Sequence, residues 1–260
     1  MVVGEEDNAG RWIGRFRSIC EHSGVGEERI ALLAGLIRIF VPLTGDAGVL
    51  ARYPGLSDFP ESLAKSLDRG DPEAVEADLV RAYVQLHGNS MGYAASERCE
   101  IDHWGGYWCH AGGFLPLIHA APHIKKDIRF VDYGAGNGFQ GLLFQSLYPH
   151  ALTTQIELSG SMIDEGKRLQ HWMGIPEERV EWIHGNILDV PPARFDFIYI
   201  YRPVRPEGPG RVFYERFARA LAGTVHPVTI FSIADCLKDF LDRSFEIFFD
   251  DGQLTCFRRG

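Results

Sequence analysis

The sequence predicts a doubly wound, mostly parallel α/β sheet that ends in an antiparallel hairpin and is preceded by a helical N-terminal extension. Three observations lead to this prediction. After Lys126, short apolar segments alternate with amphipathic ones, which is typical of parallel strands joined by helices. A glycine-rich turn follows the first of these apolar segments. Two β-type segments around an Asp-Gly turn close the chain, as in an antiparallel hairpin.

The first part of the chain is expected to be helical. Apolar residues recur at steps of three and four over 27–41, which predicts one buried helix face that Pro42 should end. Asp71 and Pro72 are typical of the first positions of a second helix. A shorter helix is expected over 57–67.

The segment from Ser90 to Gly113 shows neither helical nor strand periodicity. It is rich in glycine, aromatic residues, histidine and cysteine, and we interpret it as a functional loop. Its side chains at Cys99, His103, Cys109 and His110 are of metal-binding types. Their spacing matches no structural zinc pattern, so no metal is predicted.

Five strands and a two-stranded hairpin are expected after this segment. The strands should span 128–133, 152–158, 180–184, 195–201 and 228–233, followed by 245–249 and 254–258. Helices are expected over 138–148, 161–173 and 210–222. Proline or glycine follows each of these helices, which is typical of helix ends. We therefore expect two domains, a helical extension or cap over 1–100 and an α/β domain over 101–260.

The segment FVDYGAGNGFQG, residues 130–141, carries the clearest functional signal. Gly134, Gly136 and Gly138 remove side chains where the backbone must turn tightly, and the following helix is expected to offer free N–H groups. This pattern predicts a cofactor site; the alternative is a turn that is merely tight. Read from Gly136, it matches the fingerprint of dinucleotide enzymes, with Glu157 near the expected ribose-binding position.

A second interpretation rests on more of the sequence. Asp132 just ahead of the first glycine, the glycine at every second position, Glu157, the segment HGNILD (184–189) and the terminal hairpin resemble the class I S-adenosylmethionine (SAM)-dependent methyltransferases. The resemblance covers about residues 107–260. It implies a seven-stranded sheet with an antiparallel last strand, and SAM lying over the carboxyl ends of the first strands.

The resemblance also implies roles for individual residues. The three glycines would line the methionine part of SAM, Asp132 would meet its amino group, and Glu157 would accept both ribose hydroxyls. Adenine would be bound next to Asn186 and Ile187, although many family members have Asp at the position of Asn186. Tyr107, in the loop before the first strand, is expected to stack or pack against the cofactor.

The methyl-acceptor side is less defined. The family members that methylate DNA bases or protein glutamine have Asp or Asn followed by Pro-Pro-Tyr after the fourth strand. This chain has Tyr201, Arg202, Pro203 and Val204 there, which argues against both reactions. His103, His110 and Tyr201 are candidate catalytic groups. Tyr201 and Arg202 are candidates for acceptor contact, the alternative being that Tyr201 lies on one face of a buried strand.

Composition limits the function further. The chain has 26 basic and 35 acidic residues and a formal net charge of −9, which opposes binding to nucleic acid and to anionic membranes. A small-molecule methyl acceptor is therefore expected. The absence of a signal-like start and of a long apolar segment predicts a cytoplasmic protein. The sequence is compatible with a homodimer. The alternatives are an NAD(P)-dependent oxidoreductase and a non-catalytic SAM-binding or scaffold protein.

Overall fold

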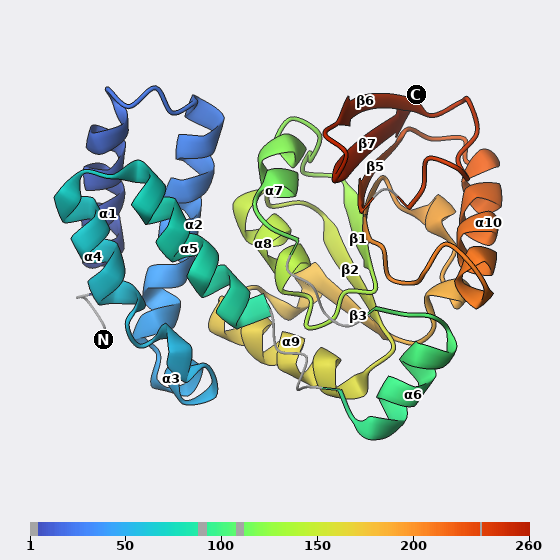
Figure 1. The fold of residues 1–260 in the computed structure, drawn as a ribbon, viewed down its shortest axis with the longest axis horizontal. Helices are drawn as coiled ribbons and strands as arrows, with labels where there is room; N and C mark the ends of the chain where they lie inside the picture. The colour runs from blue at the N-terminus through green and yellow to red at the C-terminus, as the bar shows by residue number, and fades with distance from the viewer. Residues whose placement is uncertain (1–4, 88–92, 108–111, 235) are drawn as a thin grey trace. The chain divides into compact units, whose positions relative to one another are not determined.

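The computed structural model describes residues 5–87, 93–107, 112–234 and 236–260. The chain forms two compact units. Figure 1 colours the chain by residue number, from blue at the N-terminus to red at the C-terminus. One unit comprises Met1–Asn89 and Trp172–Gly174, and the other comprises Ser90–His171 and Ile175–Gly260. The role of the helical extension as a cap stays a prediction.

The N-terminal unit is built from helices. These are α1 (Glu5–Cys20), α2 (Glu27–Gly45), α3 (Ala47–Arg52), the 3-10 helix η1 (Pro54–Leu56), α4 (Phe59–Arg69) and α5 (Pro72–His87). Buried aromatic and aliphatic side chains form its interior, including Phe16, Leu33, Phe40, Leu63, Leu79 and Tyr83. The predicted start of α5 is confirmed, since Asp71 Oδ1 accepts hydrogen bonds from the N–H groups of Glu73 at 3.1 Å and Ala74 at 3.0 Å.

A buried acid joins α4 to α5. Asp78 accepts hydrogen bonds at 2.7 Å from the hydroxyls of Ser62 and Ser66, and it forms an ion pair with Arg81. Because a buried carboxylate is costly unless its oxygens are satisfied, this network fixes how the two helices pair.

The prediction that Pro42 ends the second helix is wrong. Pro42 lies inside α2, which continues to Gly45. Proline removes the N–H that would bond to the carbonyl of Arg38, four residues earlier. Both residues are exposed, so water can reach that carbonyl, and the buried apolar face of α2 keeps the helix intact past the proline.

The C-terminal unit contains one sheet and its flanking helices. The strands are β1 (Arg129–Tyr133), β2 (Leu152–Glu157), β3 (Val180–His184), β4 (Phe197–Tyr201), β5 (Val228–Ile233), β6 (Glu246–Asp250) and β7 (Leu254–Arg259). The helices are α6 (Ala95–His103), α7 (Leu115–Ala120), α8 (Phe139–Leu147), α9 (Gly160–Trp172) and α10 (Pro209–Ala222), with 3-10 helices at Glu177–Arg179, Ile187–Asp189 and Pro192–Arg194.

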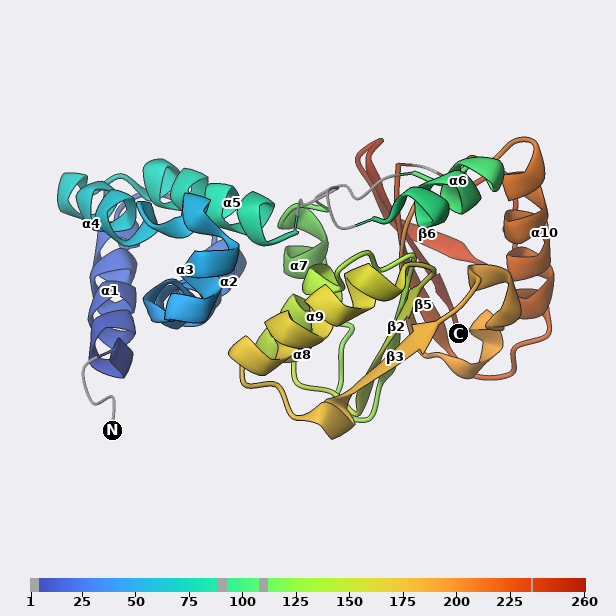
Figure 2. The same ribbon diagram turned by 90° about the horizontal axis from the view of Figure 1, so that it is seen from below.

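The predicted fold class is confirmed by the sheet. Its seven strands lie in the order β3-β2-β1-β4-β5-β7-β6. The first five pair in parallel, and β7 pairs antiparallel with both β5 and β6. Helices α8 and α9 lie on one face of the sheet and α10 lies on the other (Figure 2). The chain therefore has the doubly wound, seven-stranded architecture implied by the methyltransferase resemblance.

The predicted loop between residues 90 and 113 is partly wrong, because it contains helix α6. The carboxylate of Glu97 accepts a hydrogen bond from the Ala94 N–H at 2.7 Å and so closes the first turn. Ile101 on α6 is buried in a small apolar cluster with Tyr93 and Met162. Tertiary packing through one side chain thus stabilises a helix that has little apolar periodicity.

The order of the strands locates the functional edge of the sheet. Strand β1 has β2 on one side and β4 on the other, and both pair with it in parallel. The connections from β1 and from β4 leave toward opposite faces, through α8 and α10 (Figure 2). Ligands of open α/β sheets bind at the carboxyl ends of the strands where the winding reverses. In this sheet these are the carboxyl ends of β1 and β4.

Candidate functional site

The glycine-rich turn follows β1 directly and is shaped by close packing. Gly134, Gly136 and Gly138 have φ values of +78°, +59° and +66°, a region that side chains other than glycine rarely adopt. A Cβ on Gly134 would lie 2.7 Å from Cβ of Pro203, and one on Gly138 would lie 2.4 Å from Cη2 of Trp182. Both glycines are therefore required by neighbouring protein groups.

The backbone donors of this turn are already used inside the protein. The N–H groups of Gly134 and Ala135 donate to the Ile156 carbonyl at 3.0 and 2.9 Å, and that of Gly138 donates to the Ala135 carbonyl at 2.8 Å. Side chains accept hydrogen bonds from two further N–H groups. The Glu157 carboxylate accepts from the Gly136 N–H at 2.7 Å, and the Asn137 side-chain carbonyl accepts from the Phe139 N–H at 3.2 Å.

The expectation of free N–H groups at the start of the following helix is therefore wrong at Phe139, the first residue of α8. A phosphate group bound at a helix N-terminus needs such donors. The Phe139 N–H is therefore not free to bind a diphosphate.

Glu157 lies at the carboxyl end of β2 and faces the turn. Its side chain is buried, with Oε2 accepting from the Gly136 N–H at 2.7 Å and Oε1 accepting from the Ser159 N–H at 2.9 Å. Burial raises the pKa of this carboxyl to about 7, although hydrogen bonds from both N–H groups act in the opposite direction. Each carboxylate oxygen can accept a further hydrogen bond, so Glu157 can still receive donors from a ligand.

Asp132 is the second buried acid at this edge. It lies on β1, is 2% exposed, and has its pKa raised well above the usual range by burial and by the charge of Glu157. In the described part of the chain, neither acid forms an ion pair with a basic side chain. Two buried carboxyls with raised pKa values, one of them raised partly by the charge of the other, are typical of functional sites, and a cationic ligand would stabilise their ionised forms.

This arrangement predicts a pH dependence of stability. Because the pKa of Glu157 is raised in the folded state, its contribution to stability is present below the unfolded value, near 4.5, and is lost as pH rises through about 7. We therefore compare the free energy of unfolding of the Glu157→Gln variant with that of the wild type. The difference, variant minus wild type, should increase by roughly 2–3 kcal/mol from pH 5 to pH 8. Urea unfolding followed by circular dichroism at several pH values measures this difference.

The comparison with the variant cancels the titrating groups that Glu157 does not influence. Asp132, whose pKa is raised partly by the charge of Glu157, contributes to the measured difference. Burial lowers the pKa of His150, so that residue adds stability as pH rises and acts in the opposite direction. His150 is the same in both proteins and cancels in the difference. Parallel curves for the wild type and Glu157→Gln would show that this carboxyl does not titrate between pH 5 and pH 8.

Asn186 and Ile187 lie just after β3, as predicted. Asn186 Oδ1 accepts a hydrogen bond from the Leu188 N–H at 2.9 Å and caps the 3-10 helix that begins at Ile187. Ile187 is partly buried against an apolar cluster that includes Val190 and Phe213. The side-chain carbonyl of Asn186 thus has a structural partner, and adenine contact by these two residues stays a prediction.

Tyr107 lies beside the segment that follows β4. Its N–H donates to the Pro203 carbonyl at 3.2 Å. The guanidinium groups of Arg202 and Arg205 lie over its ring, 5.2 and 5.8 Å from the ring centre. The structure therefore places Tyr107 against the segment that follows β4, in contact with two cations, while stacking on a cofactor stays a prediction.

The three candidate catalytic residues fall in different places. Tyr201 ends β4 and is partly buried, and burial raises the pKa of its hydroxyl, which makes it a hydrogen-bonding group at neutral pH and a poor base. His103 is exposed at the end of α6, with its ring 5.6 Å from that of Trp104. His110 lies outside the described residues. Over the described ranges, no group of three or more metal-binding side chains is found.

Sequence reasoning missed one acid close to the turn. Glu97 on α6 accepts a hydrogen bond from the Ser161 hydroxyl at 3.1 Å, and its charge contributes to the raised pKa of Glu157. Ala94, at the start of this helix, is not a residue type that predicts a helix N-terminus. The sequence therefore held no local signal for the position of Glu97.

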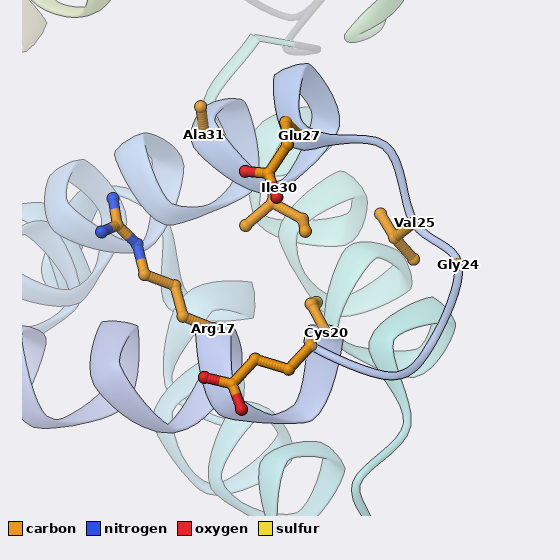
Figure 3. A pocket seen from close by; sticks show the side chains of 8 residues that line it. Arg17, Cys20, Gly24, Val25, Glu27, Ile30 and Ala31 are labelled. Carbon is orange, nitrogen blue, oxygen red and sulfur yellow. The ribbon is translucent and has the colours of Figure 1, made fainter.

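A separate pocket lies in the N-terminal unit, at the turn between α1 and α2 (Figure 3). It has a volume of about 350 Å³, and both Arg17 and Glu27 line it together with Cys20, Val25 and Ile30. All its lining residues belong to that unit, so it is distinct from the glycine turn. Among the described residues, no helix is both long and apolar enough to span a membrane.

Known proteins resemble this chain in structure at low sequence identity. No protein-family model and no curated protein matches the chain. An RNA methyltransferase from Salinibacter ruber in complex with S-adenosylhomocysteine is 14% identical over 55% of this chain and 86% of its own, with a TM-score of 0.42.

Two further solved structures match this chain over less than half of their own length. TrmN from Thermus thermophilus is 16% identical over 55% of this chain and 46% of its own, with a TM-score of 0.39. A SAM-dependent methyltransferase from Thiobacillus denitrificans in complex with S-adenosylhomocysteine is 21% identical over 45% of this chain and 46% of its own, with a TM-score of 0.34.

Proposed function

We propose that the C-terminal unit binds SAM and transfers its methyl group to a small-molecule acceptor. The observation that carries this proposal is the pair of buried acids, Asp132 on β1 and Glu157 on β2, next to a glycine turn. The N–H groups of this turn described above are bonded within the protein. Such a site favours a ligand with positive charge and hydroxyl donors over an anionic one.

The two carboxylate acceptors match the donor groups of SAM. Asp132 is an acceptor with no ion-pair partner among the described residues, and the amino group of SAM is a cation. Glu157, one strand further on, has spare lone pairs for the two ribose hydroxyls. SAM itself supplies an activated methyl group on a sulfonium leaving group. The protein needs to orient the acceptor and exclude water.

The same geometry disfavours the dinucleotide alternative. NAD(P) would place its diphosphate at the glycine turn and the start of α8. There, the N–H groups of Gly136 and Phe139 are bonded to Glu157 and Asn137. The ionised forms of Asp132 and Glu157 would also repel the diphosphate.

The acceptor is proposed to be a small molecule because the chain carries a net charge of −9, which repels a polyanion at long range. The test is methyl transfer from SAM, labelled on its methyl group, into a metabolite extract and, separately, into total tRNA. Label in a small-molecule fraction, lost in the Asp132→Asn variant, is the expected result.

Two other results, one from this assay and one that adds a binding measurement, would count against parts of the proposal. Label in tRNA alone would overturn the small-molecule acceptor. Tight binding of S-adenosylhomocysteine with no transfer to any fraction would favour the non-catalytic alternative.

A further inference from the structure

The segment after β4 borders the glycine turn and carries two arginines. Arg202 and Pro203 directly follow Tyr201, the last residue of β4. A Cβ on Gly134 would lie 2.7 Å from Cβ of Pro203, so this segment and the turn are in contact. Arg202 therefore belongs to the edge of the sheet where the proposed cofactor and acceptor would meet.

The backbone of this segment is held in a strained conformation. Arg202 has a φ of +35°, which is unfavourable for a residue with a side chain. Hydrogen bonds of the residues that follow Arg202 keep the backbone in this conformation. Gly106 and Val204 form an antiparallel bridge, and the Arg205 N–H donates to the Gly105 carbonyl at 2.9 Å. The Tyr214 hydroxyl donates to the Val204 carbonyl at 2.7 Å. Strain held in this way is typical of functional positions.

The two arginines form a local concentration of positive charge in an acidic protein. Their guanidinium groups share the ring of Tyr107, at 5.2 and 5.8 Å from its centre. Neither forms an ion pair with an acid in the described part of the chain. Nε of Arg202 is buried and has no hydrogen-bond partner there, which is costly unless a ligand supplies an acceptor.

We propose that Arg202 and Arg205, held by Tyr107, bind an oxyanion of the methyl acceptor, either a carboxylate or a phosphate. A guanidinium presents paired N–H donors that match the two oxygens of either group. The buried Nε–H of Arg202 is one donor of such a pair. This inference rests on the proposed function and specifies its substrate class as small acidic molecules.

The two kinds of charge lie at the ends of neighbouring strands. The acids Asp132 and Glu157 lie on β1 and β2, and the arginines follow β4 on the other side of β1. A cationic cofactor and an anionic acceptor would each meet charges of opposite sign on their own side. The arrangement thus favours a cationic cofactor and an anionic acceptor, and it orients the two molecules relative to each other.

The test uses the full chain saturated with S-adenosylhomocysteine and three matched probes: benzoate, phenyl phosphate and neutral benzamide. Ligand-observed NMR titration gives their affinities. We expect at least one of the two anions to bind about 10-fold more tightly than benzamide, since a charged hydrogen bond is typically stronger by this amount. The better anion identifies the group as carboxylate or phosphate.

Variants locate the binding to the arginines. Arg202→Gln should lower the affinity for the preferred anion about 10-fold, and Arg205→Gln, at an exposed position, provides a second test if the first variant does not fold. Arg216→Gln, exposed on α10, is the control for loss of one positive charge. The Kd of S-adenosylhomocysteine should stay the same in all three.

Several results would overturn the inference while leaving the proposed function intact. These are equal affinity for benzamide and both anions, an unchanged anion affinity in the Arg202 and Arg205 variants, or binding of a short RNA without binding of either small anion. An Arg202→Gln variant that loses S-adenosylhomocysteine would instead assign this arginine to the cofactor. Failure of the wild type to bind S-adenosylhomocysteine would count against the proposed function itself.

Discussion

Replacing Glu157 by alanine is expected to weaken binding of S-adenosylhomocysteine about 10- to 100-fold, because a charged acceptor of two ribose hydroxyls is lost. The carboxylate is buried at the end of β2 and in contact with the glycine turn. Isothermal titration calorimetry measures the change directly.

The matched control is Glu178→Ala. Glu178 is exposed and precedes β3, so this variant loses one negative charge without touching the turn, and its affinity should equal that of the wild type. Thermal unfolding of each variant verifies that it is folded. Equal affinities for Glu157→Ala and the wild type would remove the ribose role from Glu157.

Replacing Gly138 by alanine is expected to lower the free energy of unfolding by about 3–4 kcal/mol, through a positive φ and a steric overlap. The added Cβ would lie 2.4 Å from Cη2 of Trp182 and 3.0 Å from the side-chain amide carbon of Gln155. Gly166 on α9 lies against the same tryptophan ring, so the ring has little room to move. Urea unfolding followed by circular dichroism measures the loss.

The Gly252→Ala variant separates the cost of the positive φ from the cost of the steric overlap. Gly252, in the turn between β6 and β7, has a φ of +86° and nothing within 4 Å of an added Cβ. It should lose only the conformational part, about 1–2 kcal/mol. Losses of equal size in the two variants would contradict the close packing of the turn against Trp182.

The α/β part of the fold could be predicted well because its signals are local. Strands β3 and β5 have the predicted bounds, and the hairpin lies within one or two residues of its prediction. Strand β5 is a nearly continuous buried apolar run, β3 mixes apolar and polar residues, and Pro149, Gly174 and Gly223 follow the helices between the strands. The glycine turn was located for the same reason, since positive φ values leave a glycine signature.

Other features depend on contacts that the sequence does not display. Helix α6 is stabilised by Ile101 in a distant apolar cluster, and α2 continues past Pro42 because its other face is buried. The hydrogen bonds that use up the N–H groups of the turn come from Glu157 and Asn137, and neither bond can be deduced from spacing. The sharing of Tyr107 by two arginines likewise requires the pairing of 105–107 with 203–205.

Calorimetric titration with S-adenosylhomocysteine and with NADH, each at pH 6 and pH 8, tests the central claim most directly. Because the pKa of Glu157 is raised to about 7, a ligand that requires the ionised acids should bind about 10-fold more tightly at pH 8 than at pH 6. We predict this result for S-adenosylhomocysteine, in the micromolar range, and no binding of NADH. Binding of NADH that strengthens at pH 6, with none of S-adenosylhomocysteine, would contradict the account.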